Sequence, residues 1–244
     1  SVNAAWGDDP TSFFIDSFLQ VVPGDTFSWA PAWSVMIPLA LVWILVLFVI
    51  GRGLSKGVEA ANKIFLPLLV ILFLALVVRA LFLPGAVEGL NAFFTPNWGA
   101  LVDPKVWLAA FAQIFYSLSV GFGIMLTYAS YLQRKSNLTG TALVAGFANS
   151  SFEILAGIGV FSAVGFMAHQ GGVSVSEVEG LTGPILSFVT FPKIISMMPG
   201  GPLFGVLFFS SLVLAGVTSL LSLLQVVSGG LQDKFGWSPA RSAL

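Results

Sequence analysis

Five long apolar runs are the feature of this sequence that most restricts its fold. Each has about 20 residues or more and, as a helix, can cross a hydrocarbon core of roughly 30 Å. They lie at residues 31–50, 64–83, 106–131, 142–168 and 203–227. With 57% hydrophobic and 9% charged residues, the composition excludes an ordinary soluble domain, in which about a quarter of the residues are charged. The sequence therefore predicts an all-α integral membrane protein with a single transmembrane domain over residues 1–244.

The distribution of basic residues predicts the orientation of these spans. Seven of the ten follow the first, third and fifth spans, namely Arg52, Lys56, Lys63, Arg134, Lys135, Lys234 and Arg241. Because lysine and arginine accumulate in cytoplasmic loops, this side is expected to face the cytoplasm. A multi-pass protein of the cell membrane follows, with the N-terminal end of this chain outside and its C-terminal end inside. Eight of the eleven acidic residues are expected outside, namely Asp8, Asp9, Asp16, Asp25, Glu88, Asp103, Glu177 and Glu179.

Two outer segments are expected to lie beyond the membrane spans. Residues 1–30 are polar and acidic and form an extracellular loop segment. Residues 169–202 contain an apolar patch that Pro192 interrupts, too short and broken to span a membrane. We expect short helices there, which either form a lid over the outer mouth or simply pack on helix ends.

The residue types that this chain lacks exclude several kinds of activity. There is no cysteine, so thiol catalysis and structural disulfides are excluded. The single histidine, His169, makes neither a metal site nor a catalytic triad. No phosphate loop, nucleophile elbow or zinc motif is present, and the net charge of −1 argues against a nucleic-acid partner. An enzyme is not expected.

The third span has small and polar residues in its middle, where a membrane helix is usually apolar. Its centre carries two hydroxyls and two glycines, Ser117, Ser119, Gly121 and Gly123. Non-helical backbone at membrane depth is tolerated only where it lines a cavity or binds a ligand. A stretch unwound around residues 117–121 would offer oxygens to a small cation, and the amides of the helix resuming near Phe122 suit a carboxylate. Close packing of small residues between helices is the alternative.

The fourth span carries a formal charge deep in the membrane. Glu153 lies about midway along it, and Asn149, four residues earlier, shares its helix face. A carboxylate at that depth costs about 2.5–3.5 kcal/mol on insertion scales, so a functional role is expected by default. The alternative is a neutral Glu153 that is bonded to a neighbouring helix.

Two further features bear on ions and on helix flexibility. The fifth span has a stripe of small and hydroxyl side chains, Ala215, Thr218, Ser219 and Ser222. The stripe can supply three oxygens to a sodium-sized ion, although spacing alone slightly favours close packing with hydroxyls bonded to the preceding turn. Pro67 removes a backbone donor inside the second span, and together with Gly57 it could let the cytoplasmic end of that helix unwind. The alternative is a proline that the membrane helix merely tolerates.

Together these motifs resemble the neurotransmitter:sodium symporter family, in particular its bacterial amino-acid branch, which has the leucine-transporter fold. The resemblance rests on residues 113–123 and 127–131, on Asn149 with Glu153, and on residues 215–219. It covers nearly the whole chain, which would correspond to helices four to eight of the family. It implies five transmembrane helices that form part of an inverted-repeat sodium symporter fold, with the third span unwound in its middle.

The resemblance also implies a role for individual residues. Two sodium ions would be bound, the first by Ser117 and Asn149 with the substrate carboxylate, and the second by Ala215, Thr218 and Ser219. The substrate would contact Tyr116, Ser117, Ser119, Phe122, Ser219 and Leu223. Gly121 would permit the unwinding of the third span, and the pair Gly57 and Pro67 would help to open a solvent path to the second sodium site.

The same resemblance concerns chloride. Family members that need chloride have a serine at the position of Glu153. A fixed carboxylate there, near Gln113, would replace the anion and make transport independent of chloride.

The function implied is sodium-coupled symport of a neutral, hydrophobic or aromatic amino acid by alternating access. The first helices of the family and those after the eighth would be missing, so the chain would be about half a transporter and would need those helices for function. One alternative is a truncated, non-transporting membrane scaffold. An ion channel is a second alternative, but a channel would be expected to have rings of repeated pore residues from several subunits.

Overall fold

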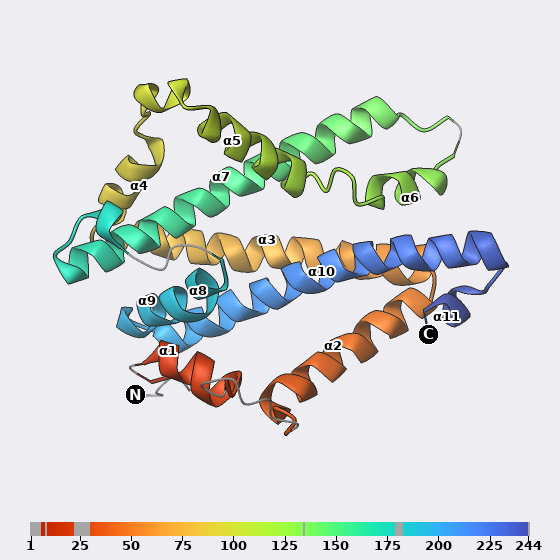
Figure 1. The fold of residues 1–244 in the computed structure, drawn as a ribbon, viewed down its shortest axis with the longest axis horizontal. Coiled ribbons are helices and arrows are strands. Elements are labelled where there is room, and N and C mark those ends of the chain that lie inside the picture. The colour runs from red at the N-terminus through yellow and green to blue at the C-terminus, as the bar shows by residue number, and fades with distance from the viewer. Residues whose placement is uncertain (1–5, 8, 22–29, 134, 179–182, 244) are drawn as a thin grey trace.

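A computed structural model describes residues 6–7, 9–21, 30–133, 135–178 and 183–243 of the chain (Figure 1). The larger helices are α2 (Trp33–Gly51), α3 (Ala60–Leu81), α4 (Ala86–Phe94), α5 (Pro104–Ser117), α6 (Ile124–Ser130), α7 (Leu138–Gly171), α9 (Phe191–Met197) and α10 (Gly201–Phe235). Short helices are α1 (Pro10–Ser12), α8 (Gly183–Ile185) and α11 (Pro239–Ser242), with π-helical turns at Phe13–Phe18, Leu54–Glu59 and Leu186–Thr190 and 3-10 turns at Trp98–Val102 and Val175–Glu177. The described residues contain no β-strand.

Four of the five predicted spans are single helices long and apolar enough to cross a membrane. They are Trp33–Gly51, Lys56–Leu81, Leu138–Gly171 and Gly201–Phe235. The fifth predicted span, residues 106–131, is divided between α5 and α6, and neither half is long enough to cross alone. The prediction that this span is unwound in its middle is therefore confirmed.

The long helices form a bundle in which α10 is central. Helix α10 runs beside α3 along the length of the molecule, α7 packs on α3, and α2 packs on α10 (Figure 1). The innermost apolar cluster joins α2, the turn before α3, and α10 through Val46, Val49, Ile50, Val58, Val217 and Leu221. The C-terminal end of α2 and the turn before α3 are thus fixed against the middle of α10.

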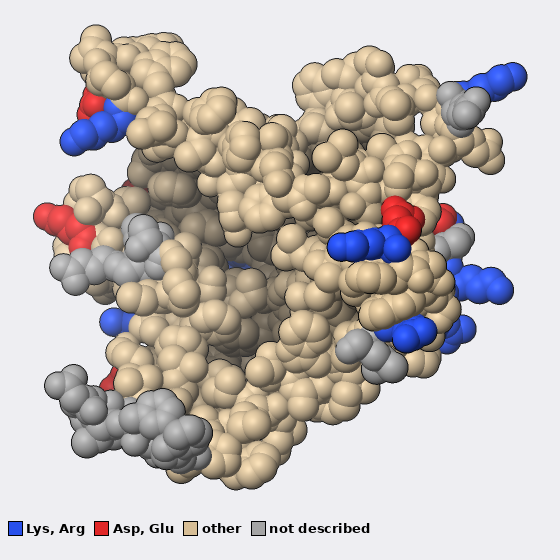
Figure 2. Space-filling model, turned by 45° about the vertical axis from the view of Figure 1, so that its right-hand side comes forward, with Lys and Arg blue, Asp and Glu red and all other residues tan. Residues whose placement is uncertain are grey.

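Charged side chains lie at two opposite ends of the molecule, with an uncharged band between them (Figure 2). Many large apolar side chains in this band are exposed, among them Leu41, Ile44 and Ile71. In water such a surface would be unfavourable, whereas in a bilayer it contacts hydrocarbon. The charge distribution and the apolar band together fit a membrane-embedded protein. Arg134, Asp8, Asp25 and Glu179, which also entered the predicted orientation, lie outside the described residues.

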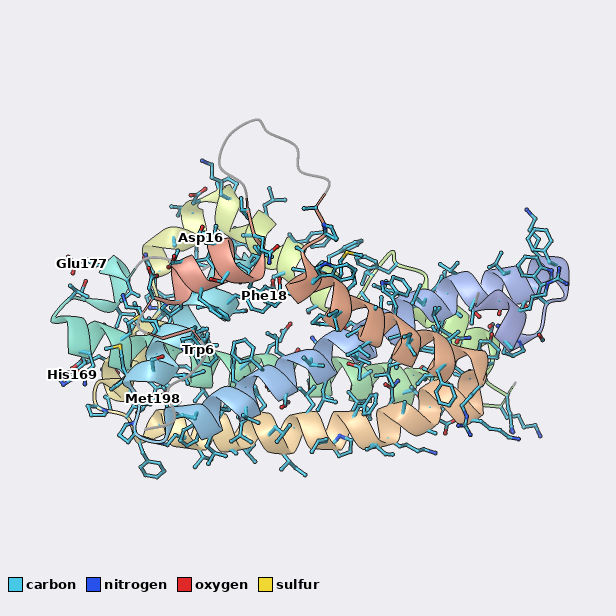
Figure 3. The ribbon with its side chains drawn as sticks, turned by 90° about the horizontal axis from the view of Figure 1, so that it is seen from below. Trp6, Asp16, Phe18, His169, Glu177 and Met198 are labelled. Atoms are coloured by element: carbon cyan, nitrogen blue, oxygen red, sulfur yellow. The ribbon has the colours of Figure 1, made fainter. Side chains whose placement is uncertain are left out.

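The end of the bundle that carries Asp16, Glu88 and Glu177, which we call the acidic end, is covered by short elements, and the opposite end is the basic end. Trp6, His169, Glu177 and Met198 all lie at this end (Figure 3). The indole nitrogen of Trp6 donates a hydrogen bond of 2.7 Å to the Ser196 hydroxyl, which joins the first residues to α9. Helix α9 is itself anchored by Ile194, which packs with Leu83 and Phe166. The predicted short helices of residues 169–202 are present where that segment is described, and they are packed on the bundle.

Candidate functional site

The interruption between α5 and α6 is produced by a run of left-handed backbone. Ser119 has a φ of 54°, and Gly121 and Gly123 have φ values of 87° and 77°. Glycine adopts this region freely, whereas a serine there costs on the order of 1–2 kcal/mol. The helix resumes at Ile124 rather than near Phe122, because Gly123 is still left-handed and caps the new helix. Regular helical bonding is lost across the break, where the amides of Ser119, Val120 and Phe122 bond instead to the carbonyls of Tyr116, Phe115 and Ser119.

This break faces an open cavity of about 630 Å³ at the middle of the bundle. We call it the central cavity. Its wall is built by α3, by the break, by α7 and by α10, which are far apart in the sequence. Eight of the site residues expected from the sequence line it: Tyr116, Ser117, Ser119, Phe122, Asn149, Thr218, Ser219 and Leu223. Segments separated by about a hundred residues thus meet at one place.

The residues expected for the first ion are in direct contact. The Asn149 side-chain nitrogen donates to the Ser117 hydroxyl at 3.1 Å, across the space between α7 and the end of α5. Both side chains are partly buried. This pairing places the Asn149 carboxamide and the Ser117 hydroxyl on one side of the cavity, where neutral oxygens can contact a small cation.

The hydroxyl stripe on α10 is bonded along its own helix. Thr218 donates to the carbonyl of Ala215 at 3.0 Å, and Ser222 donates to the carbonyl of Thr218 at 3.1 Å. These are hydrogen bonds to the preceding turn of the helix, as expected from the alternative in which the stripe serves close helix packing. They also hold the Thr218 hydroxyl oxygen within 3.0 Å of the Ala215 carbonyl oxygen, so a turn of the hydroxyl proton would let both oxygens face a cation. Ala215 itself is not among the residues that line the cavity.

The rest of the wall is largely apolar and aromatic. The rings of Tyr116 and Phe122 face each other across the break with centroids 6.2 Å apart and an interplanar angle of 77°. Leu66, Ile124, Ala145 and Leu223 add aliphatic surface. Hydroxyl and amide oxygens beside apolar walls suit a small ligand with a polar head and an apolar side chain.

Gln113 and Glu153 do not contact this cavity. Gln113 is exposed on α5, and Glu153 is half-buried on α7, one turn beyond Asn149. In the described part of the chain no hydrogen bond joins the two side chains. Their expected pairing therefore stays a prediction.

The structure places Gly57 and Pro67 on the same segment but in different surroundings. Gly57 lies in the π-helical turn before α3, and a β-carbon there would come within 1.9 Å of the Val49 carbonyl oxygen. Glycine is required by this close approach of α2. Pro67 lies inside α3 and lines a second cavity on the basic side of the bundle. The structure thus gives Gly57 a packing role.

Sequence reasoning missed Asn62 and gave the Ser222 hydroxyl no role at the site, yet both line the central cavity. Asn62 is a carboxamide close to the second predicted apolar span, and this isolated polar side chain could have indicated a site residue.

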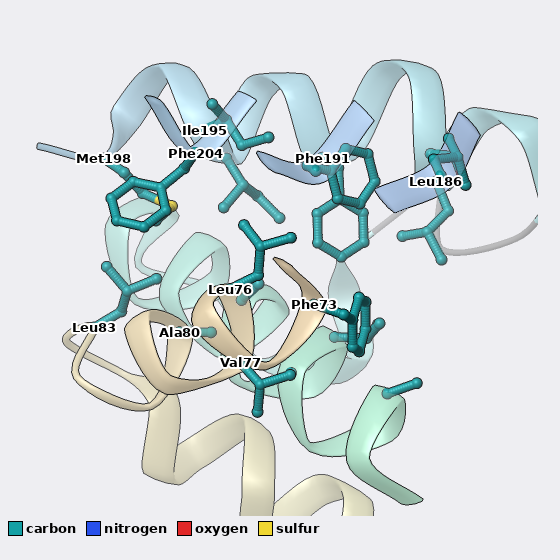
Figure 4. A pocket seen from close by; sticks show the side chains of 18 of the residues that line it. Phe73, Leu76, Val77, Ala80, Leu83, Leu186, Phe191, Ile195, Met198 and Phe204 are labelled. Carbon is teal, nitrogen blue, oxygen red and sulfur yellow. The ribbon is translucent and has the colours of Figure 1, made fainter. Parts of the chain in front are cut away.

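A third cavity, of about 250 Å³, lies elsewhere between α3, α7, α9 and α10 (Figure 4). Its lining is almost wholly apolar, so it offers no ion site.

The described residues contain no group of three or more His, Cys, Asp or Glu side chains that could hold a metal ion. The oxygens of the central cavity are neutral hydroxyl, amide and carbonyl groups. Such hard ligands suit a weakly bound alkali cation better than a transition metal, which is bound by imidazole or thiolate.

Comparison with known proteins places these features in a family context. The sequence profile described as "Sodium:neurotransmitter symporter family" matches residues 2–243. An uncharacterized sodium-dependent transporter of Methanocaldococcus jannaschii is 39% identical over 239 residues, which cover 97% of this chain and 48% of the relative. The sodium- and chloride-dependent creatine transporter 1 of Bos taurus is 34% identical over 210 residues, which cover 85% of this chain and 32% of that transporter.

A solved structure shares the fold. The crystal structure of MhsT in complex with L-phenylalanine superimposes with a TM-score of 0.75 and 36% sequence identity over 99% of this chain and 50% of MhsT. The helical transporter fold expected from the sequence is thereby confirmed. The chain spans about half the length of the archaeal relative and of MhsT.

Proposed function

Because this chain belongs to the sodium:neurotransmitter symporter family, we propose that it forms the part of a sodium-coupled symporter that carries much of the substrate and ion site. The family consists of sodium-coupled transporters and not of enzymes. The substrate that we propose is a neutral amino acid with a hydrophobic or aromatic side chain, moved by alternating access. The observation that carries this proposal is the central cavity, where the helix break, Asn149 and the α10 stripe meet.

The composition of the cavity wall supports the substrate class. Tyr116, Phe122 and Leu223 give an apolar surface for a side chain, and no formally charged residue lines the cavity to pair with a charged one. The amides of the first turn of α6, which have no partner within the helix, can bind the substrate carboxylate. The similar transporter MhsT was crystallised with L-phenylalanine, which fits the same class.

We assign one sodium ion to this cavity and a second to the stripe on α10 beside it. The first has Ser117 and Asn149, whose side chains are 3.1 Å apart, and is completed by the substrate carboxylate. The second has the carbonyl of Ala215 and the hydroxyls of Thr218 and Ser219, of which the first two are already 3.0 Å apart. Sodium accepts neutral oxygen ligands of this kind.

The orientation and the remaining partners are part of the same proposal. The basic end of the bundle would face the cytoplasm and the acidic end the exterior. Since the chain spans 48% of its archaeal relative, we propose that transport needs further helices that complete the cavity. The lipid bilayer surrounds the apolar band.

The test is sodium-dependent binding of labelled neutral amino acids to the full-length transporter in detergent. We expect binding of a hydrophobic or aromatic amino acid in sodium that is lost when potassium replaces sodium. Ser117→Ala and Thr218→Ala should each weaken the sodium dependence by about tenfold or more, because each removes one ligand of a charged group. Ser210→Ala, on α10 but away from the central cavity, serves as the control. Unchanged sodium dependence in both site variants would refute the assignment.

A further inference from the structure

The central cavity shares one wall with a second cavity at the basic end of the bundle. This second cavity, which we call the inner cavity, has a volume of about 630 Å³ and lies between α3 and α6. Lys63 and Glu59 lie on its rim, where they form an exposed ion pair of 2.8 Å. Two residues of α3, Asn62 and Leu66, line both cavities. The shared wall is therefore formed in part by one turn of α3.

Asn62 has an oxygen without a partner in this wall. Its side-chain Oδ1 is shielded from solvent and accepts no hydrogen bond from any described residue. An unsatisfied buried acceptor costs about 1–3 kcal/mol, so such an atom is uncommon in a folded protein. Leu66, one turn later on the same face, has no polar atom on its side chain. Asn62 thus supplies a free side-chain oxygen where α3 separates the two cavities.

Other hydroxyls of the wall are already engaged. The Tyr128 hydroxyl, from the inner cavity, donates to the Ser222 hydroxyl of the central cavity at 3.0 Å. Ser222 in turn donates to the Thr218 carbonyl at 3.1 Å. These two hydrogen bonds connect the inner cavity to the hydroxyl stripe on α10 that we assign to the second sodium ion. Tyr128 and Ser222 are bonded to each other, whereas the Asn62 oxygen is not bonded.

A second oxygen becomes available on the same turn of α3. Pro67 has no backbone N–H, so the carbonyl of Lys63 lacks its i+4 amide donor. The Asn62 carboxamide oxygen and a backbone carbonyl that has lost its i+4 donor therefore lie one residue apart on α3. Oxygen atoms that a protein leaves free in this way suit a hard cation or its bound water.

We propose that the Asn62 oxygen is a transient ligand for a sodium ion, bound directly or through one water, as the ion moves between the central and inner cavities. The inference rests on the proposed symport function. An ion that leaves neutral oxygen ligands must regain oxygens to cross a wall that Leu66 makes apolar. One neutral oxygen lowers that barrier without trapping the ion, as conduction requires.

The test measures transport and binding separately in the full-length transporter. Asn62→Leu removes the oxygen and keeps a side chain branched at the same carbon. In proteoliposomes it should lower the turnover rate about tenfold or more, the scale of losing one oxygen ligand to a charged group. Equilibrium sodium-dependent substrate binding should change less than about twofold, a difference below 1 kcal/mol. Asn91→Leu on α4, which lines neither cavity, is the matched control and should leave both quantities unchanged.

A second variant keeps the oxygen and adds charge. Asn62→Asp should hold sodium in the wall, so sodium on the basic side should inhibit turnover at a concentration at least about threefold lower than in the wild type. Unchanged turnover in Asn62→Leu, or an equal loss of turnover and of equilibrium binding, would overturn the inference. If Asn62→Leu does not fold, unchanged sodium inhibition in Asn62→Asp overturns it. A wild type that neither binds nor moves an amino acid refutes the symport proposal instead.

Discussion

Glu153 is the residue to which the family resemblance assigns independence from chloride. Its half-buried carboxyl lies on α7, one turn beyond the Asn149 amide that reaches Ser117. A fixed negative charge there would balance bound sodium in place of a mobile anion. We therefore predict that wild-type uptake is unchanged when gluconate replaces chloride, and that Glu153→Ser makes uptake depend on chloride.

The control for this prediction is Glu88→Ser. Glu88 is an exposed carboxylate at the acidic end, 3.8 Å from His169. Its loss should leave uptake insensitive to chloride. A chloride requirement in the wild type, or chloride-independent uptake by Glu153→Ser at a normal rate, would contradict the assigned role of Glu153.

Glu177 gives a prediction about pH outside the membrane. Its carboxylate accepts a 2.9 Å hydrogen bond from the Ser174 amide, and this bond, with a second from the Ser174 hydroxyl, lowers the pKa of Glu177 below its ordinary value of 4.5. Because the pKa is lower in the folded state, the capped turn is stabilised above the ordinary pKa. That stabilisation is lost as pH falls through the lowered pKa.

The carboxyl carbon shift of labelled Glu177 measures this pKa. We expect a midpoint below 4.5 in the wild type. Ser174→Pro should raise it, since proline fits the Ser174 φ of −76° and removes both donors. A midpoint that does not move in Ser174→Pro would show that the cap does not lower the pKa.

Among the elements, α4 and α7 approach each other through glycine. A β-carbon at Gly165 would lie 2.3 Å from the Gly85 carbonyl oxygen and 2.6 Å from the Gly89 amide nitrogen. These neighbours are backbone and cannot rotate away. Gly165→Ala should therefore lower stability by about 1–3 kcal/mol, the usual cost of overpacking.

Thermal unfolding of the full-length transporter in detergent tests this packing. Gly171→Ala on the same helix is the control, because a β-carbon there meets only Val173 at 3.6 Å, an ordinary contact. We expect a lower melting temperature for Gly165→Ala and little change for Gly171→Ala. Equal melting temperatures for the two variants would show that α4 moves aside at low cost.

The elements also show what the sequence can and cannot predict. Helix positions followed from apolar runs, and the break followed from Ser119 and Gly121 among apolar neighbours. The end of the break was misplaced because a positive φ at Gly123 depends on how α6 packs on α10. Asn62 was missed because its importance comes from two cavities formed by other helices. A linear pattern cannot show which segments will share a wall.

At the scale of the molecule, α5 and the break have a wide exposed surface. Tyr116 is 71% exposed although it lines the central cavity, and Leu126 on α6 is 80% exposed. The chain spans about half the length of the archaeal relative and of MhsT. These facts agree with a site whose second wall is supplied by other helices.

The orientation of the whole molecule can be tested directly because this chain has no cysteine. Thr95, after α4, is exposed at the acidic end, and Asp233, in the last turn of α10, is exposed at the basic end. In a full-length background free of other cysteines, we expect a membrane-impermeant maleimide added to intact cells to label Thr95→Cys. Asp233→Cys should be labelled only after the membrane is permeabilised, because the lysines and arginines near it hold that end in the cytoplasm. Detergent-solubilised samples, in which both positions react, control for accessibility. The reverse pattern would contradict the proposed orientation, because the inner cavity would then open to the exterior.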